Sequence, residues 1–366
     1  MESEFPKSQI AGVQTVIPAK ATLHRKVRPI SAEDAAGAGI FRRTLDIVLY
    51  YKHGSGDTDS GWVGAGWIKE SRGRALTEQP ALSGRLRRRK AEEDGGGLEV
   101  VANDSGVRLV EAKFPASMPE FLELAKRDMA KAEAETLFWR DIDEDDPQFS
   151  PLFYVQVTNF ECGGYSVGIS CSILLADIII GTDFIRRWSE IHSSILLHNN
   201  DEPTPTPVFY LPALKQDISY LSTLSTSVSI RSVSEPVVFR AKPTSLGSEI
   251  RERFASIHTE KVLGSELVGR SCPDVFLFVK EQGDEKLEVR SRSYGGEVSH
   301  ENDDDGDFEE SAQFSELSFW PGKRPNHSSC KIGSVSDGLV LVVPYPCGDD
   351  DDMSKSMVKM IVASPP

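Results

Sequence analysis

The sequence predicts a mixed α/β protein whose strands and helices alternate along the chain and build mixed sheets. Thr44–Tyr51 (TLDIVLYY) is rich in β-branched and aromatic residues, which is typical of a strand. Phe149–Ser172 reads as two strands joined by the tight turn Cys162-Gly163-Gly164. Helix-type segments over Trp67–Leu76 and Phe114–Arg140 lie between such strands. Strands separated by helices in this way indicate sheets covered by helices.

The other elements of the first half follow from periodicity and from turn residues. Residues 10–30 alternate apolar and polar positions and predict an opening strand that ends at Pro29. Gly61–Gly66 is rich in glycine and predicts a loop, since it lacks the order of a phosphate-binding motif. Further strands are predicted over Leu82–Arg87, Leu98–Ala102 and Val107–Ala112, with a turn at Asn103–Gly106 and a helix over Asp183–Leu197.

The second half has a different composition. Residues 199–236 are rich in Asn, Pro, Ser and Thr and predict a linker or long crossover between a domain at 1–198 and a domain at 237–366. The acidic, Gly-rich residues 295–313 predict a surface loop or disorder. Strands are predicted over Val237–Phe239, Val275–Lys280 and Gly338–Val343, helix over residues 245–267, and helix or strand over Met353–Ala363.

Composition excludes several partners. The net charge of -15 argues against binding to nucleic acid or to anionic lipid, because both need clustered positive charge. No apolar run approaches the ~20 residues of a membrane span. The N-terminal MESEFPKSQI has no apolar signal region, and the five cysteines show no C-x-x-C pair, so we expect reduced thiols in the cytoplasm.

Several blocks, in order, resemble the plant BAHD acyl-CoA-dependent acyltransferases. Leu45–Lys52, Gln79–Arg85, Leu98–Ala112 and Val155–Trp188 all match motifs of that family. The resemblance implies a chloramphenicol-acetyltransferase-like, two-domain fold with a reduced C-terminal domain. The short second half is explained equally by divergence or by an incomplete gene model. A third interpretation of the protein as a whole is a truncated gene product that does not fold independently.

The family's His-x-x-x-Asp motif is altered in this chain. Asp177 is present, but Ile173 stands where the resemblance places the catalytic histidine. A histidine suits base catalysis because its pKa lies near neutrality, whereas isoleucine cannot take a proton. We weigh two structural roles for Asp177 equally: a helix cap, or an ion pair with an arginine as the family implies.

The family's second signature, Asp-Phe-Gly-Trp-Gly-Lys-Pro, survives only in part. Phe319, Gly322 and Lys323 align with it, within Ser318–Pro325, and are the candidate cofactor-binding residues that the resemblance implies. The aspartate and the Gly-Trp pair do not align. The ligand implied is acyl-CoA, as ligand or co-substrate, and no further cofactor is expected.

Other residues are weaker candidates for chemistry. Ser172 has no partner to make it basic, and Cys171 is expected to be a small buried apolar residue. His192 and His198 are predicted to lie on the surface, and the histidines form no metal-ligand pattern. Phe184 and Trp188, four residues apart on one helix, are predicted core. Glu301–Glu310 lacks the last ligand of a calcium loop. The basic run Arg85–Lys90 is interpreted as a solvated strand end.

Together these observations favour a BAHD-family protein with impaired catalysis. It would bind acyl-CoA or act as an accessory partner of an acyl-chain-elongating enzyme, as the resemblance to the ECERIFERUM2-like branch implies for very-long-chain fatty acid and wax metabolism. The alternative is an active acyl-CoA-dependent transferase of acyl groups other than aminoacyl, acting on a hydroxyl or an amine.

Overall fold

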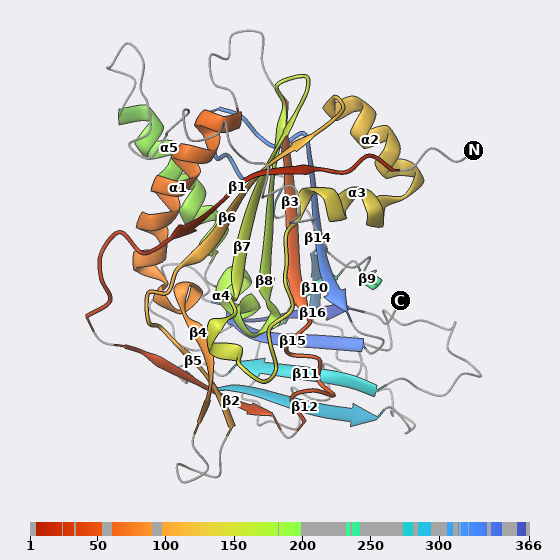
Figure 1. Ribbon diagram of the computed structural model, residues 1–366. Helices are drawn as coiled ribbons and strands as arrows, with labels where there is room; N and C mark the ends of the chain where they lie inside the picture. The colour runs from red at the N-terminus through yellow and green to blue at the C-terminus, as the bar shows by residue number, and fades with distance from the viewer. Residues whose placement is uncertain are drawn as a thin grey trace, which may run out of the picture.

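The computed structural model places most of the first half of the chain and several separate strands of the second half (Figure 1). The residues that it describes are 5–23, 25–32, 34–52, 61–89, 97–181, 183–198, 232–234, 236–241, 274–280, 285–293, 306–309, 314, 316–320, 322–334, 338–345 and 357–363. The predicted helix over residues 245–267 and residues 301–305 of the segment rejected as a calcium loop lie outside these residues.

A seven-stranded mixed sheet forms the first layer, in the order β1-β6-β7-β8-β3-β14-β9. At its centre, β7 and β8 form the predicted hairpin around the Cys162-Gly163-Gly164 turn, where Gly163 has a positive φ of 82°. Only β6 and β7 pair in parallel; the other neighbours are antiparallel. The strands are β1 (Gln9–Val16), β3 (Thr44–Tyr51), β6 (Val107–Phe114), β7 (Phe153–Phe160), β8 (Tyr165–Ser172), β9 (Ser232–Ser234) and β14 (His327–Ser334).

Helices α1 (Gly61–Glu78) and α5 (Phe184–His198) cover one face of this sheet, which we call the apolar face (Figure 1). Alternate residues of β7 and β8, among them Val155 and Ile169, join residues of α1 and α5 in one large hydrophobic core. That core also takes in strands of the second sheet, so a single apolar interior runs from α1 to the far layer.

Helices α2 (Met118–Arg127) and α3 (Met129–Thr136) cover the other face, the polar face (Figure 1). Ser117 and Glu120 form a capping box that begins α2. At α3, Gln156 Nε2 donates to the carbonyl of Glu135 at 2.8 Å, and Lys331 Nζ lies 2.7 Å from Glu133 Oε2. The helix end packs directly on β8, because a Cβ at Gly168 would collide with the carbonyl oxygen of Thr136.

A nine-stranded mixed sheet forms the second layer, in the order β13-β10-β16-β15-β11-β12-β2-β5-β4. The short helix α4 (Ala176–Gly181) lies between the two sheets and contacts β15. The strands are β2 (Val27–Ala32), β4 (Arg85–Arg89), β5 (Gly97–Val101), β10 (Val237–Ala241), β11 (Asp274–Lys280), β12 (Leu287–Ser293), β13 (Gly306–Glu309), β15 (Gly338–Tyr345) and β16 (Met357–Ala363).

Each sheet takes strands from both halves of the sequence. Strands β2, β4 and β5 belong to the nine-stranded sheet, whereas β9 and β14 complete the edge of the seven-stranded sheet. The two sheets therefore do not coincide with segments 1–198 and 237–366, and the division into two domains stays a prediction. The mixed α/β class with mixed sheets is confirmed.

Four predicted elements were wrong in part. Residues 10–30 form two strands rather than one, because β1 joins the first sheet and β2, which contains Pro29, joins the second. Gly61–Gly66 is helical, since it is the first part of α1 and precedes Trp67 and Ile68, which pack in the interior and outweigh the low helix propensity of glycine. The strand expected at Leu82 starts only at Arg85, after a 3₁₀ turn over Pro80–Ser83. The segment 295–313 contains strand β13.

Candidate functional site

The turn after β8 carries the candidate catalytic positions. β8 ends at Ser172, the 3₁₀ turn Ile173–Leu175 follows, and α4 begins at Ala176. The hydroxyl of Ser172 accepts a hydrogen bond from the backbone N–H of Leu174 at 3.4 Å and so caps the turn. The backbone N–H of Ile173 donates to the carbonyl of Arg43 at 3.0 Å. These bonds fix the backbone at the position where the family resemblance places a base.

The side chain of Ile173 is completely buried and belongs to the large hydrophobic core. The next two residues, Leu174 and Leu175, are equally buried. This surrounding is apolar, and burying a charged base in it would be energetically costly. The geometry at Ile173 is that of a packing residue.

Cys171, two residues before Ile173, does not supply a replacement base or nucleophile. Burial raises the pKa of the Cys171 thiol well above its ordinary value, and the nearby carboxylate of Asp46 raises it further. The thiol therefore stays protonated and is not a nucleophile at neutral pH. The predicted role of Cys171 as a small buried apolar residue is confirmed.

Asp177 forms a buried ion pair. Its Oδ2 lies 2.9 Å from the Nη2 of Arg28, and both side chains are less than a tenth exposed. The pair is close but poorly aligned: within the described residues, the Oδ1 of Asp177 and two nitrogens of Arg28 have no hydrogen-bond partner. Of the two roles weighed for Asp177, the structure shows the ion pair. Because Arg28 lies on β2, the pair joins α4 to the nine-stranded sheet.

A second cluster surrounds Phe319. Its ring packs edge-on against Trp188 of α5, with 4.8 Å between ring centroids. Trp188 Nε1 donates to Ser71 Oγ of α1 at 2.9 Å, and the same hydroxyl lies 2.9 Å from Nδ1 of His192. The cluster thus joins α1, α5 and the segment before β14. Phe184 and Trp188 are core residues, as predicted.

The predicted surface position of His192 was wrong, because this side chain is fully buried. Phe184, Trp188 and His192 are spaced by four residues and therefore lie on one face of α5. Burial lowers the pKa of His192 to about 3, so the ring is neutral at physiological pH. A neutral histidine bonded to a hydroxyl resembles a base and nucleophile, but both groups are enclosed in the interior, and their position suits a helix-to-helix tie.

Gly322 and Lys323 lie in a turn after the aromatic cluster. Gly322 has a φ of 72°, a conformation that favours glycine, and the Lys323 N–H donates to the carbonyl of Trp320 at 2.9 Å. The two residues thus close a tight turn, while Phe319 is a core residue. Their proposed contact with acyl-CoA stays a prediction.

The candidate residues are held by different elements. Ile173 and Asp177 lie in the turn and helix after β8, whereas Phe319 packs on α5. Sequence reasoning missed Arg28, for which the alternating pattern of β2 gave no signal. It also missed the Ser71–His192 contact, although the four-residue spacing on α5 could have indicated a buried histidine.

The described part of the chain contains neither a membrane-spanning helix nor a cluster of metal ligands. Among the helices of the described residues, no helix has both the length and the apolar composition of a membrane span. The His, Cys, Asp and Glu side chains of these residues form no group of three that could hold a metal ion.

Comparisons with known proteins agree on one family. A family model described as "Transferase family" matches residues 11–242, which is more than half of the chain. A hydroxycinnamoyltransferase of Narcissus pseudonarcissus is 30% identical over 189 residues, covering 48% of this chain and 41% of that protein. Protein ECERIFERUM 2 of Arabidopsis thaliana is 30% identical over 116 residues, covering 31% of this chain and 27% of that protein.

The matched part spans less than half the length of these two relatives. Among solved structures, vinorine synthase aligns with 98% of this chain and 94% of its own, at 13% identity and a TM-score of 0.45.

Proposed function

We propose a function for this chain from the premise that it belongs to the BAHD acyltransferases, the family described by the matching model. In this proposal, it is a family member that lacks ordinary acyl-transfer activity and instead binds acyl-CoA or serves as an accessory protein. The burial of Ile173 carries the proposal. At the position where the family resemblance places the general base, the side chain is apolar, fully enclosed and part of the hydrophobic core.

The size of the expected defect follows from the chemistry. Removal of the acceptor's proton accompanies its attack on the thioester, and loss of a general base slows such steps by about 10²–10⁴-fold. Cys171 does not compensate, since its pKa is raised by burial. Asp177 is engaged with Arg28 and acts structurally in this proposal.

The accessory role draws on the relatives. Proteins ECERIFERUM 2 and ECERIFERUM 26-like of Arabidopsis thaliana are among the similar proteins. From this similarity we propose that the chain acts in the cytoplasm as an accessory partner of an acyl-chain-elongating enzyme in very-long-chain fatty acid and wax metabolism. Gly322 and Lys323 are the residues that we propose to contact acyl-CoA in a reduced C-terminal domain at 237–366.

The test measures binding and turnover in the same samples. Long-chain and aromatic acyl-CoAs are titrated into the purified full chain by calorimetry, while product formation with hydroxyl and amine acceptors is followed by mass spectrometry. Binding without product is the expected result. Multiple turnovers by the wild-type chain would overturn the proposal.

The variant Ile173→His, with Ile173→Leu as its matched control, separates the missing base from other defects. We expect neither variant to transfer acyl groups, because the Ile173 position is enclosed in the core and gives no route to an acceptor. Activity gained by Ile173→His alone would show that the rest of the site is competent.

An active transferase is the second candidate, favoured by the hydroxycinnamoyltransferases among the similar proteins. Such an enzyme would move an acyl group, other than aminoacyl, to an acceptor acidic enough to lose its own proton. Transfer retained in Ser172→Ala would support this substrate-assisted mechanism, and the absence of transfer across a broad acyl-CoA panel would exclude it.

A further inference from the structure

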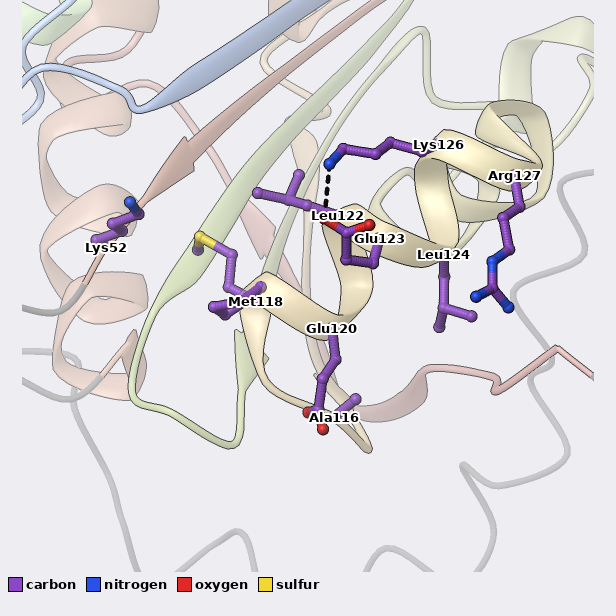
Figure 2. A pocket seen from close by; sticks show the side chains of 10 residues that line it. Lys52, Ala116, Met118, Glu120, Leu122, Glu123, Leu124, Lys126 and Arg127 are labelled. Carbon is purple, nitrogen blue, oxygen red and sulfur yellow. Dashed lines mark hydrogen bonds and ion pairs between the residues drawn. The ribbon is translucent and has the colours of Figure 1, made fainter.

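A surface hollow of about 700 Å³ lies over α2, on the polar face of the seven-stranded sheet (Figure 2), and Ile173 is not among the residues that line it. Its volume falls within the range of sites that hold small molecules, which is about 300–1,000 Å³. The side chains that line it come from the end of β3, the segment before α2 and α2 itself: Lys52, Ala116, Met118, Pro119, Glu120, Leu122, Glu123, Leu124, Lys126 and Arg127.

The walls of the hollow combine apolar surface with positive charge. Met118 is buried, and Leu122 is a partly buried residue that packs on the aromatic cluster beneath α2. Figure 2 shows Met118 and Leu122 lying between the ammonium groups of Lys52 and Lys126. This arrangement places an apolar strip between two cations.

The two cations differ in how they are engaged. Lys126 Nζ lies 2.6 Å from Glu123 Oε1, but both side chains are about two-thirds exposed, so this pair stabilises the helix only slightly. The ammonium of Lys52 has no ion-pair partner among the described residues, while its backbone N–H donates to Asn326 Oδ1 at 2.9 Å and fixes the strand end. Glu120 is occupied by the capping box of α2. The hollow therefore has positive charge to offer a ligand.

The charge of the whole chain makes this local arrangement informative. At a net charge of -15, the protein as a whole repels anions, so an anion that binds does so through a specific group of cations. We propose that the hollow over α2 binds an amphipathic carboxylate, with its apolar part on Met118 and Leu122 and its carboxylate at Lys52 and Lys126. The site is distinct from the acyl-CoA proposal, since Gly322 and Lys323 are not among the residues that line the hollow.

The test uses decanoate as the probe, titrated into the full chain by calorimetry below its micelle concentration, with decanol as the uncharged control. We expect saturable one-to-one binding of decanoate and at least about tenfold weaker binding of decanol, because the charge-assisted contacts are lost. A decanoate analogue carrying a photoreactive diazirine should label peptides containing residues 116–127.

Matched variants identify the side chains. Lys52→Gln should weaken decanoate binding by about three- to tenfold, whereas Arg74→Gln, the same charge change on the exposed face of α1, should leave it unchanged. Glu123→Gln should strengthen decanoate binding, because it removes the ion pair that holds Lys126. Leu122→Gln should weaken the binding of both decanoate and decanol, because it removes apolar surface from the hollow. Lys52 and Glu123 are exposed and Leu122 is only partly buried, so we expect the variants to fold, which circular dichroism checks. Equal binding by wild type and Lys52→Gln, or labelling elsewhere in the chain, would overturn the proposal.

Discussion

The two faces of the seven-stranded sheet are covered in different ways, although the polar face is itself apolar beneath α2, where Val48, Phe114 and Phe160 form a second hydrophobic cluster. The apolar face holds α1 and α5 by packing, with Val155 and Ile169 in the large core. The polar face holds α3 by directed bonds, including Gln156 to Glu135 and Lys331 to Glu133. Ile173 lies in the core on the apolar side. The difference teaches that polar and charged side chains bond to one another beneath α3, whereas Ile173 is enclosed by apolar side chains where the family resemblance places the base.

The largest expected effect concerns His192 on the apolar face. Its pKa is lowered to about 3 in the folded state, while an unfolded chain has the ordinary value of about 6.5. Between these values the unfolded chain binds a proton that the folded chain rejects, so stability falls as pH falls from about 6.5 to 3 and is unaffected above this window. At ~1.4 kcal/mol per pKa unit, the loss from this group amounts to about 4–5 kcal/mol.

Urea unfolding between pH 7 and pH 3 measures this loss. His192→Gln should remove that part of the pH dependence, although it lowers stability at pH 7. The exposed His327 gives the matched control, and His327→Gln should keep the wild-type slope. An unchanged slope in His192→Gln would show that the apolar face admits charge after all.

The buried ion pair Arg28–Asp177 on the apolar side gives the next largest effect. Arg28→Met leaves a buried carboxylate without its partner and should lower the free energy of unfolding by about 3–5 kcal/mol. The double variant Arg28→Met/Asp177→Leu should recover most of this loss, because it removes both charges. The exposed pair Arg42–Glu144 is the control, where Arg42→Gln should change stability by less than about 1 kcal/mol.

The buried pair on the polar face should be less sensitive. Glu133→Gln removes the ion-pair partner of Lys331 but leaves an uncharged acceptor in its place, and Asp46 lies opposite Lys331 in the neighbouring strand. We expect a loss of about 1.5–3 kcal/mol in urea unfolding. Glu123→Gln, at an exposed pair on α2, is the matched control. A loss as large as that of Arg28→Met would remove the distinction between the two faces.

Adjacent tyrosines of β3 give the smallest and most direct comparison. The Tyr51 hydroxyl donates to the carbonyl of Leu317 at 3.2 Å on the apolar side, while Tyr50 lies 3.4 Å from Thr136 Oγ1 on the polar side. Tyr51→Phe should cost about 1 kcal/mol, since a buried carbonyl loses its donor. Tyr50→Phe should cost less, because Thr136 keeps its bond to the carbonyl of Glu133. Thermal unfolding of the two variants side by side measures the difference.

Local patterns were enough to predict several elements. Thr44–Tyr51 was predicted with its observed bounds, and the β7–β8 hairpin and the core positions of Phe184 and Trp188 were also confirmed. In each case the residues that decide the structure are neighbours in the chain, so propensity and spacing contain the information.

The wrong predictions concern segments whose structure depends on contacts with distant parts of the chain. The pattern of residues 10–30 is compatible with one strand, and only pairing with β6 and β5 divides it between two sheets. Gly61–Gly66 is helical because α1 packs on α5 and the sheet, and Arg28 meets Asp177 only through the stacking of β2 beneath α4. At the candidate site, the identity of Ile173 was evident from sequence, but its complete enclosure was not.

The exchange of strands between the two sheets has a consequence for synthesis on the ribosome. Strand β3 pairs on one side with β8 and on the other with β14, which starts 276 residues after Tyr51 at His327. One edge of β3 therefore stays without its native partner until most of the chain has emerged, and an exposed strand edge of this kind can pair with other chains. Chaperone binding during translation should accordingly persist until residues 327–334 leave the exit tunnel.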